Sequence, residues 1–421
     1  MKMFGPLSRF RIYTTPTTYL KTAVDALLLQ SKRNGDLRNI EEAIKGVTGL
    51  PYAICMPQAR VGIFLALRAL ISPGQKVILS AYTIHDVINM VICAGGVPVF
   101  ADIDRETCNL NPSYTAELID ENTGAVLVTH LHGLAMEMDE LSQVCLDKGV
   151  PLIEDASQAF GARLGGQSVG SFGDVGVFSF GMYKNLNSFY GGMVVTRREE
   201  FHRRISHEIA GFRPFEMAIL LKKVANGFIT DVATNPLLFR YLTFPLFRYG
   251  YLNNIEVINK RVRVEDNPQI KRTIPKQYLR RMRPLQARTC LRSLPRVEDD
   301  SRKRIEFARY YHDGLEPMKE LICPPFRDDH SHIYTYYPIQ YSDRNALIRH
   351  MMKYGCDIGA QHLKNCADLD CFEEFHRDCP NTRATAKDTI LLPTYPRYSH
   401  KDVKRNIRVI RQFFGRTEAP L

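Results

Sequence analysis

The stretch that decides the fold is residues 152–196, which read LIEDASQAFGARLGGQSVGSFGDVGVFSFGMYKNLNSFYGGMVVT. Three short apolar runs lie in or at the edge of it: Val150–Ile153, Val175–Phe180 and Met193–Val195. Short apolar runs bounded by glycine and polar residues are typical of buried strands. In open α/β sheets, functional residues collect just beyond the carboxyl ends of such strands. The polar residues at the ends of these runs are therefore the first candidates for a site.

Three side chains stand at such positions. Asp155 follows the first run, Ser179 lies in the second, and Lys184 follows it. Pyridoxal phosphate needs an amine that holds it as a Schiff base and a carboxylate that keeps its ring nitrogen protonated. Its phosphate needs hydroxyl and backbone donors. Singly, such a lysine is most often solvated and such an aspartate is often a helix cap or ion-pair partner. Together they indicate a pyridoxal-phosphate site.

The stretch resembles the DegT/DnrJ/StrS family of sugar aminotransferases, whose pattern runs EDAAQA.GA…G..GD…FSF….KN…..GGA.VT. The residues in register are Glu154-Asp155-Ala156-Ser157-Gln158-Ala159, Gly161-Ala162, Gly170, Gly173-Asp174, Phe178-Ser179-Phe180, Lys184-Asn185, Gly191-Gly192 and Val195-Thr196. The resemblance implies that Lys184 is the catalytic residue and holds the cofactor, that Asp155 pairs with the ring nitrogen, that Gln158 contacts the ring hydroxyl and that Ser179 contacts the phosphate. A sister branch that removes a sugar hydroxyl has histidine in place of the lysine, so Lys184 favours transamination.

The fold class implied by the resemblance is α/β, a fold-type I pyridoxal-phosphate transferase. We expect a mostly parallel, doubly wound sheet in a large domain and a smaller α+β C-terminal domain. The regular alternation of strand-like and helix-like segments before residue 150 supports this sheet. The expected domains are residues 1–282 and 283–421, with a helical insertion at 201–277.

Three places depart from the family pattern. Relatives bind the cofactor phosphate with Ser-Gly-Thr-Ala at a helix N-terminus, where this chain has Gln58-Ala59-Arg60-Val61. A helix N-terminus still binds anions, and Arg60 either adds a charged contact or is an exposed helix-start residue. Relatives stack an aromatic residue on the cofactor ring where this chain has Ile84, followed by His85; we favour His85. Arg281 is the candidate contact to the phosphate in a neighbouring subunit, unless it only forms surface ion pairs.

The insertion is longer and more apolar than the family segment, and it interleaves aromatic with basic residues. It either packs on the core or a second subunit, or it lies in a membrane interface with its basic residues facing anionic lipid. Pro214, Pro236 and Pro245 predict broken helices and no continuous span. A peripheral membrane contact through residues 214–250 is thus one of two hypotheses.

Composition limits the other functions. The net charge of +11 among 421 residues indicates either acidic partners or a solvated basic surface. No nucleic-acid-binding motif is present, and the ten cysteines form no C-x-x-C pair, as in a reducing cytoplasm. The spacings of Cys356, Cys366, Cys371 and Cys379 match no common metal site. No signal peptide or spanning segment is evident. We expect a cytoplasmic protein with no metal, or one peripheral at the inner face of the membrane.

The resulting hypothesis is an aminotransferase that moves an amino group, glutamate being the usual donor in relatives, to a keto sugar. A nucleotide-linked acceptor and a role in surface polysaccharide or amino-sugar biosynthesis are expected. An active site shared between subunits implies at least a homodimer. Two alternatives stay open: the same chemistry on a lipid-linked acceptor, and a catalytically silent relative that binds a sugar nucleotide.

Overall fold

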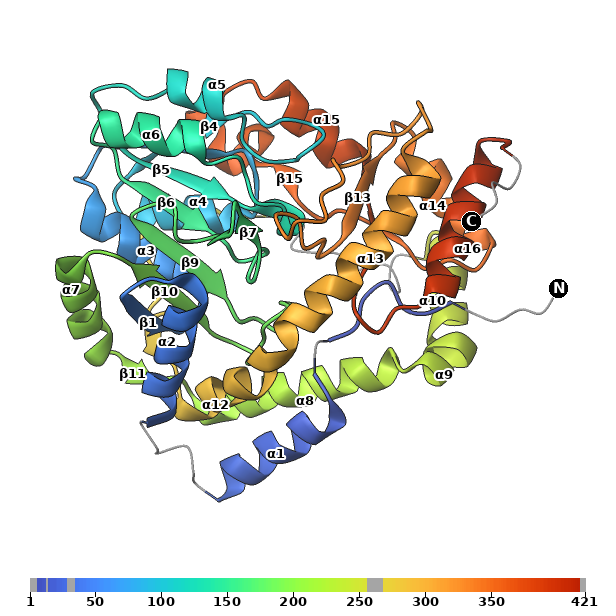
Figure 1. Ribbon diagram of the computed structural model, residues 1–421, viewed down its shortest axis with the longest axis horizontal. Coiled ribbons are helices and arrows are strands. Elements are labelled where there is room, and N and C mark those ends of the chain that lie inside the picture. The colour runs from blue at the N-terminus through green and yellow to red at the C-terminus, as the bar shows by residue number, and fades with distance from the viewer. Residues whose placement is uncertain (1–5, 13, 29–34, 256–267, 417–421) are drawn as a thin grey trace.

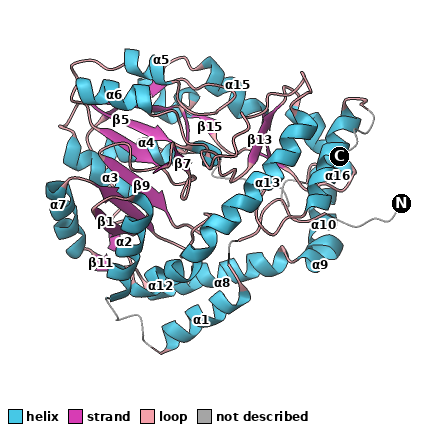
Figure 2. Ribbon diagram, in the orientation of Figure 1, coloured by secondary structure: helices cyan, strands magenta, loops and turns pink. Residues whose placement is uncertain are grey.

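The architecture was analysed in a computed structural model that describes residues 6–12, 14–28, 35–255 and 268–416. At its centre is a seven-stranded sheet of order β1-β10-β9-β6-β5-β2-β4 (Figures 1 and 2). Its strands are β1 (Tyr52–Met56), β2 (Lys76–Ser80), β4 (Val97–Ala101), β5 (Thr123–Thr129), β6 (Leu152–Asp155), β9 (Val175–Ser179) and β10 (Gly192–Thr196). Strand β10 is antiparallel to both neighbours, and the other pairs are parallel. The expected mostly parallel α/β sheet is confirmed.

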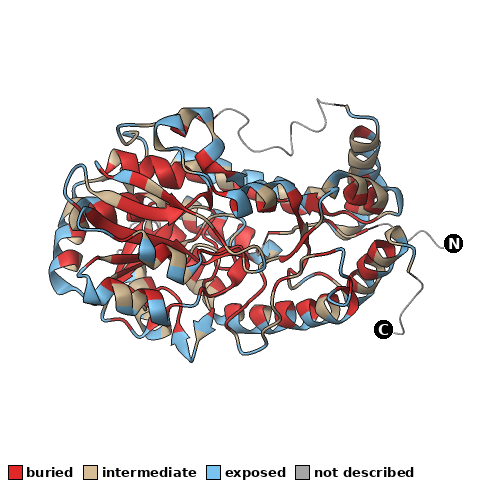
Figure 3. Ribbon diagram, turned by 90° about the horizontal axis from the view of Figure 1, so that it is seen from above, coloured by how far each residue is buried: buried red, intermediate tan, exposed pale blue. Residues whose placement is uncertain are grey.

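Helices cover both faces of this sheet because its strands bury side chains on both sides. In β1, Ile54 packs toward one layer and Cys55 toward the other, as the two-residue repeat of a strand requires. The first layer holds α3 (Ala59–Leu70), α4 (His85–Cys93) and α7 (Glu199–Ala210). The second holds α2 (Gly35–Thr48), α5 (Pro112–Glu117), α6 (Asp139–Asp147) and α12 (Pro284–Ser293). Figure 3 shows the strands as the most completely buried part of the fold.

Close packing between α3 and the sheet depends on one glycine. A Cβ on Gly62 would lie 2.8 Å from a methyl of Val194 and 3.2 Å from one of Val177. Contacts this short force a shift of the neighbouring atoms, so a larger residue would push α3 away from β9 and β10. The N-terminus of α3 is thereby held next to the carboxyl end of β9 and the first residue of β10, Gly192.

The C-terminal part has its own core around a three-stranded antiparallel sheet of order β13-β16-β14. The strands are β13 (Tyr337–Gln340), β14 (Gly359–Ala360) and β16 (Thr389–Leu392), and α13 (Val297–Leu315), α14 (Arg344–Lys353) and α16 (His400–Phe413) pack on them. Strand β15 (Lys364–Asn365) pairs with β3 (Tyr82–Thr83), and α15 (Pro380–Asp388) follows it. This pairing connects the C-terminal part to the segment that directly follows β2 of the large sheet. The remaining two-residue strands are β7 (Arg163–Leu164), β8 (Gln167–Ser168), β11 (Arg213–Pro214) and β12 (Arg280–Arg281).

The expected boundary at residue 282 stays a prediction, and two observations favour a later one. Ala287 and Cys290 of α12 belong to the core of the large sheet. The C-terminal core begins with Ile305 of α13 but also takes in Phe239 and Phe244 from the predicted insertion. The two parts therefore exchange elements across residue 282.

The predicted insertion forms broken helices, as its prolines indicated. They are α8 (Met217–Ala233), α9 (Pro236–Leu238), a π-helical turn (Phe239–Thr243) and α10 (Phe244–Leu252). Helix α1 (Pro16–Leu27) lies along α8, where the rings of Tyr19 and Phe228 meet edge to face with centroids 5.5 Å apart (Figure 1). Residues 256–267 of the insertion lie outside the described residues. None of the helices described is long and apolar enough to cross a membrane.

Candidate active site

A cavity of about 320 Å³ lies at the carboxyl ends of β5, β6 and β9, between the large sheet and the C-terminal part. Thr129, Asp155 and Ser179 are the residues that end these strands. Further lining residues come from five other segments: Phe10 and Arg11; Gln58, Ala59, Arg60 and Ile63; Thr83, Ile84 and Val87; Thr335 and Tyr336; and Gln361, His362 and Leu363. This is the position at which parallel α/β sheets bind ligands.

The two consecutive acids at the end of β6 have different surroundings. Glu154 is fully buried and accepts hydrogen bonds from the backbone amides of Gly170, Phe172 and Gly173 at 2.7–2.8 Å. It also lies 3.0 Å from Nε2 of His130. These four contacts fix the turn before β9, so Glu154 is structural.

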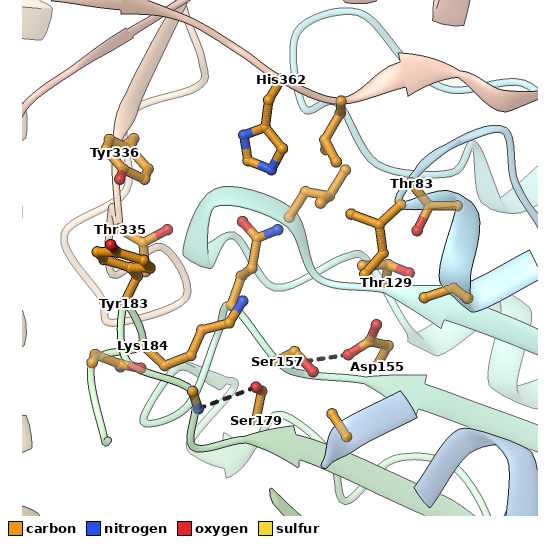
Figure 4. Close-up of a pocket in the computed structure, with 18 of the residues that line it drawn as sticks. Thr83, Thr129, Asp155, Ser157, Ser179, Tyr183, Lys184, Thr335, Tyr336 and His362 are labelled. Carbon is orange, nitrogen blue, oxygen red and sulfur yellow. Dashed lines mark hydrogen bonds between the residues drawn. The ribbon is translucent and has the colours of Figure 1, made fainter. Parts of the chain in front are cut away.

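Asp155 lines the cavity instead, and its Oδ1 accepts a hydrogen bond from Ser157 N at 3.0 Å. Lys184 reaches into the same cavity from the loop after β9 (Figure 4). Burial lowers the pKa of the Lys184 amine, and the carboxylate of Asp155 acts in the opposite direction. A buried amine with a lowered pKa is more easily deprotonated, which is what a nucleophilic or basic lysine requires.

Gln158 and Ser179 also line the cavity, and each makes one weak local contact. Oε1 of Gln158 accepts from His132 N at 3.2 Å, and Oγ of Ser179 accepts from Gly181 N at 3.4 Å. Both side chains keep further hydrogen-bonding capacity, because a hydroxyl can donate and an amide has two N–H groups.

The N-terminus of α3 forms another wall through Gln58, Ala59 and Arg60. The first bond of the helix is donated by Gly62 N to Gln58 O, so the amides before it have no partner within the helix. Nε2 of Gln58 is buried and has no hydrogen-bond partner among the described residues. Free amides at a helix start attract anions.

Arg60 lies at this wall but is already paired. It forms an ion pair with Asp86, and its guanidinium lies 5.5 Å from the centre of the Tyr278 ring. Lys271 binds the other oxygen of Asp86 at 2.6 Å. Burial, and after it the charge of Arg60, lowers the pKa of Lys223 on α8. Two cations, Arg60 and Lys271, thus share the Asp86 carboxylate, and Lys223 adds a further positive charge nearby.

Ile84 lines the cavity and His85 is not among the described residues that do. This placement favours Ile84 as the ring neighbour, and the sequence preference for His85 stays a prediction. Ile84 is the N-cap of α4, and His85 starts the helix with Nε2 3.8 Å from Asp86 Oδ1. Adjacent residues at a helix start point in different directions. Arg281 is exposed in β12 and is likewise absent from the described lining of this subunit's cavity.

Sequence reasoning missed the residues that the chain ends and the C-terminal part contribute. His362 lines the cavity, and burial followed by the charge of Lys184 lowers its pKa. Tyr183 and Tyr336 lie on the same side as Thr335 (Figure 4). The sequence carried no local signal for them beyond the position of Tyr183 next to Lys184. Within the described part of the chain, no three His, Cys, Asp or Glu side chains are grouped to hold a metal.

The lining residues fit pyridoxal phosphate. Lys184 supplies an amine, Asp155 a carboxylate, and the start of α3 a phosphate-binding wall. Gln58 Nε2 and Ser157 Oγ are buried polar atoms in this cavity for which the described residues provide no partner. Buried polar groups normally have hydrogen-bond partners. The lack of a partner for these two atoms among the described residues is therefore what we expect of a site that binds a polar ligand.

Comparison with known proteins supports the same assignment. The model of the DegT/DnrJ/EryC1/StrS aminotransferase family matches residues 20–214 and 260–411, which leaves all of α8–α10 unmatched. The spore coat polysaccharide biosynthesis protein SpsC of Bacillus subtilis is 27% identical over 387 residues, 89% of this chain and 88% of SpsC. The UDP-N-acetyl-3-dehydro-alpha-D-glucosamine 3-aminotransferase of Acidithiobacillus ferrooxidans is 36% identical over 170 residues, 40% of this chain and 46% of that enzyme.

Among solved structures, an aminotransferase from Psychrobacter cryohalolentis superposes with a TM-score of 0.76 at 21% identity, covering 97% of this chain and 99% of the other. This likeness shows the shared fold. The family match carries the function further, because it spans both parts of the chain and includes the cavity with Lys184 and Asp155. The chain belongs to the DegT/DnrJ/EryC1/StrS aminotransferase family, and it is a transaminase that depends on pyridoxal 5′-phosphate.

Proposed function

We propose that the protein transfers an amino group from glutamate to a nucleotide-linked keto sugar that is destined for a surface polysaccharide. The observation that carries the chemistry is the buried amine of Lys184 opposite the carboxylate of Asp155 in one cavity. The acceptor class is suggested by the names of two relatives, a UDP-sugar 3-aminotransferase and a spore coat polysaccharide protein. The donor is the one usual in the family.

The roles of the residues follow from their positions. When bound, the cofactor supplies an electron sink that makes the α-carbon of the amino donor acidic. The amine of Lys184 would remove and return the proton of that carbon, as base and as acid. Asp155 holds a proton on the ring nitrogen, because a carboxylate stabilises the charged form of a neighbouring base. Burial lowers the pKa of Lys184, which makes its amine easier to deprotonate.

The cofactor would be held by residues on three walls. Gln158 contacts the ring hydroxyl, Ser179 and the amide of Ala59 bind the phosphate, and Arg60 adds charge to that end. Ile84 covers the ring face by apolar contact. Arg60 can serve the phosphate while paired with Asp86, because Lys271 shares that carboxylate and a positive charge is left over.

A homodimer is part of this proposal. Arg281 is exposed in β12, in the motif that reaches the neighbouring cofactor phosphate in relatives. Two subunits would then complete each other's sites. The test measures both the fraction of dimer and the amount of bound cofactor in Arg281→Ala. We expect this variant to lose cofactor and to remain a dimer.

We further propose a cytoplasmic enzyme that makes peripheral contact with anionic lipid at the inner face of the membrane. Phe215, Phe239 and Phe244 are buried, but Phe228, Tyr241 and Tyr249 are exposed. Exposed apolar residues follow one another at helical spacing along α9, the π-helical turn and α10. We call this set of residues the α10 stripe; it consists of Leu238, Tyr241, Leu242, Pro245, Leu246 and Tyr249. Residues 217–252 contain one acid, Asp231, and it is buried. Apolar and basic surface together favour an anionic bilayer.

A catalytically silent relative that binds a sugar nucleotide is the second candidate, favoured by the pairing of Arg60 with Asp86 where relatives have a free threonine. Incubation with glutamate and a UDP-linked 3-keto or 4-keto sugar separates the candidates. The proposal predicts 2-oxoglutarate and an aminated sugar in equal amounts by mass spectrometry. Binding of the nucleotide sugar without either product would favour the silent relative, and amination of a lipid-linked keto sugar alone would move the acceptor to the membrane.

A further inference from the structure

The chain reaches the cavity first with an N-terminal strap, residues 8–12. Nε of Arg9 donates to Asp357 Oδ1 at 2.8 Å, and the hydroxyl of Tyr395 donates to Ser8 O at 2.8 Å. Both anchors belong to the C-terminal part of the fold. The two residues that follow these anchors, Phe10 and Arg11, line the cavity.

Arg11 enters the cavity wall as a nearly buried cation. Its Nη2 lies 2.9 Å from Oδ1 of Asp231 on α8, and the two side chains are only 10% and 9% exposed. Its Nε is buried and has no hydrogen-bond partner among the described residues. One donor of this guanidinium is therefore available to something that is not part of the described protein.

The charge around Asp231 is unbalanced. Arg397 also approaches Oδ1 of Asp231, at 3.5 Å, and it donates to Ile12 O and Thr14 O. Burial, and after it the charge of Arg11, lowers the pKa of Arg397. Two guanidinium groups thus meet one carboxylate, and Arg397 spends donors on the backbone of the strap. A buried charge without full compensation is costly, and an anion entering from the cavity would relieve that cost.

The strap also lies near the reacting lysine. The ring of Phe10 meets the ring of Tyr183 edge to face, with centroids 5.5 Å apart, and Tyr183 precedes Lys184 in the chain. Both rings line the cavity. A group bound by Arg11 would therefore sit on the Lys184 side, whereas the start of α3 serves the cofactor phosphate.

We infer that Arg11 binds an oxyanion of a substrate, either a carboxylate of the amino donor or a phosphate of the nucleotide-linked acceptor. The inference rests on the proposed function only for the identity of these two substrates. Arginine suits both groups, because its planar donors match carboxylate and phosphate oxygens. Asp231 holds the guanidinium at the wall and leaves its Nε for the ligand.

The test is equilibrium binding of two probes to the purified holoenzyme by titration calorimetry: glutarate, a dicarboxylate without the amine, and UDP. Arg11→Gln should weaken one probe by at least tenfold, as expected when one partner of a charge-assisted hydrogen bond is lost. The affected probe identifies the source of the oxyanion. Arg9→Gln is the matched control, because it removes an ion pair from the same strap outside the cavity, and it should change neither affinity more than twofold.

Two results would overturn the inference: unchanged affinity for both probes in Arg11→Gln, or an equal loss in Arg9→Gln, which would reduce Arg11 to an anchor of the strap. Arg11→Met, which keeps the stem of the side chain, replaces Arg11→Gln if that variant does not fold, and it is read by the same criteria. The visible absorbance of the bound cofactor is recorded on each sample. A protein that never binds pyridoxal phosphate contradicts the proposed function, whereas a loaded protein with unaltered probe binding contradicts only the role of Arg11.

Discussion

The cavity at the strand ends and the helical segment α8–α10 differ in how well their local sequence predicts their function. In the cavity, the residues that the sequence pattern predicted stand where short buried strands end, as Asp155 and Ser179 do. In α8–α10, many apolar side chains follow helical spacing, and some of them stay exposed. Local pattern therefore specifies chemistry well where the backbone is constrained on both faces. Where helices lie on the surface, the local pattern shows which face of the helix is apolar but not what that face contacts.

The largest effect is expected when the amine of Lys184 is removed. Lys184→Ala should abolish turnover, because no other residue is proposed to transfer the proton. Lys148→Ala is the control; its Nζ donates to Ile119 O, outside the described cavity lining. Steady-state assay of both variants with glutamate checks this. Substantial activity in Lys184→Ala would remove the cavity from the chemistry.

The two acids of β6 give the next largest effects, and the effects should differ in kind. Asp155→Asn should keep the fold and the bound cofactor but lose most of the turnover, because a neutral ring nitrogen is a poorer electron sink. Glu154→Gln should instead lower the free energy of unfolding by about 1.5–3 kcal/mol, because a buried carboxylate loses a charge-assisted hydrogen bond. Rate measurements and denaturant titrations separate the two. A near-normal rate in Asp155→Asn would make that residue merely structural.

A smaller effect is expected at the start of α3. Arg60→Ala should weaken cofactor affinity by roughly tenfold to a hundredfold, the loss that follows when a charge-assisted contact is removed. Arg68→Ala on the same helix is the control, because Arg68 pairs with Glu208 and is not among the described lining residues. Equilibrium titration of the apoprotein with pyridoxal phosphate measures both. Equal affinities in the two variants would return Arg60 to a structural ion pair.

The smallest effect concerns the surface segment. Replacing Tyr241, Leu242, Leu246 and Tyr249 by serine should reduce sedimentation with anionic vesicles several-fold and leave turnover of a soluble acceptor unchanged. Point changes are preferable to deletion, because Phe239 and Phe244 belong to the C-terminal core. Binding of the unaltered protein should weaken as salt rises, because ions screen lysine and arginine.

The control replaces Leu146 and Tyr354, which are exposed on α6 and just after α14. If the unaltered protein ignores anionic vesicles at every salt concentration, the α10 stripe contacts protein and not lipid.

Much of the fold was accessible from sequence because its strands are short and bounded. The run Met193–Val195 lies within β10, and the run Val175–Phe180 differs from β9 by one residue. The sequence also predicted that Asp155 and Lys184 lie close together, because the carboxyl ends of parallel strands meet at one side of the sheet. The family resemblance then supplied the cofactor.

The remainder depended on tertiary placement. Which of Ile84 and His85 faces the cavity is decided by the rotation at the start of α4, and the sequence pattern does not fix that angle. Arg11 and His362 reach the cavity from opposite ends of the chain, so no local spacing connects them with Lys184. The aromatic residues of the insertion divide between a core and the surface because α10 presents one side to α14. Periodicity alone could not tell which side is covered.

The central claim is that Lys184 holds the cofactor at the strand-end cavity. Its most direct test is reduction of the purified protein with borohydride, followed by digestion and mass spectrometry of the labelled peptide. We expect a single label of reduced pyridoxal phosphate on Lys184, present also in the serine variant of the α10 stripe. A label on another lysine, such as Lys223 of α8, would contradict the account.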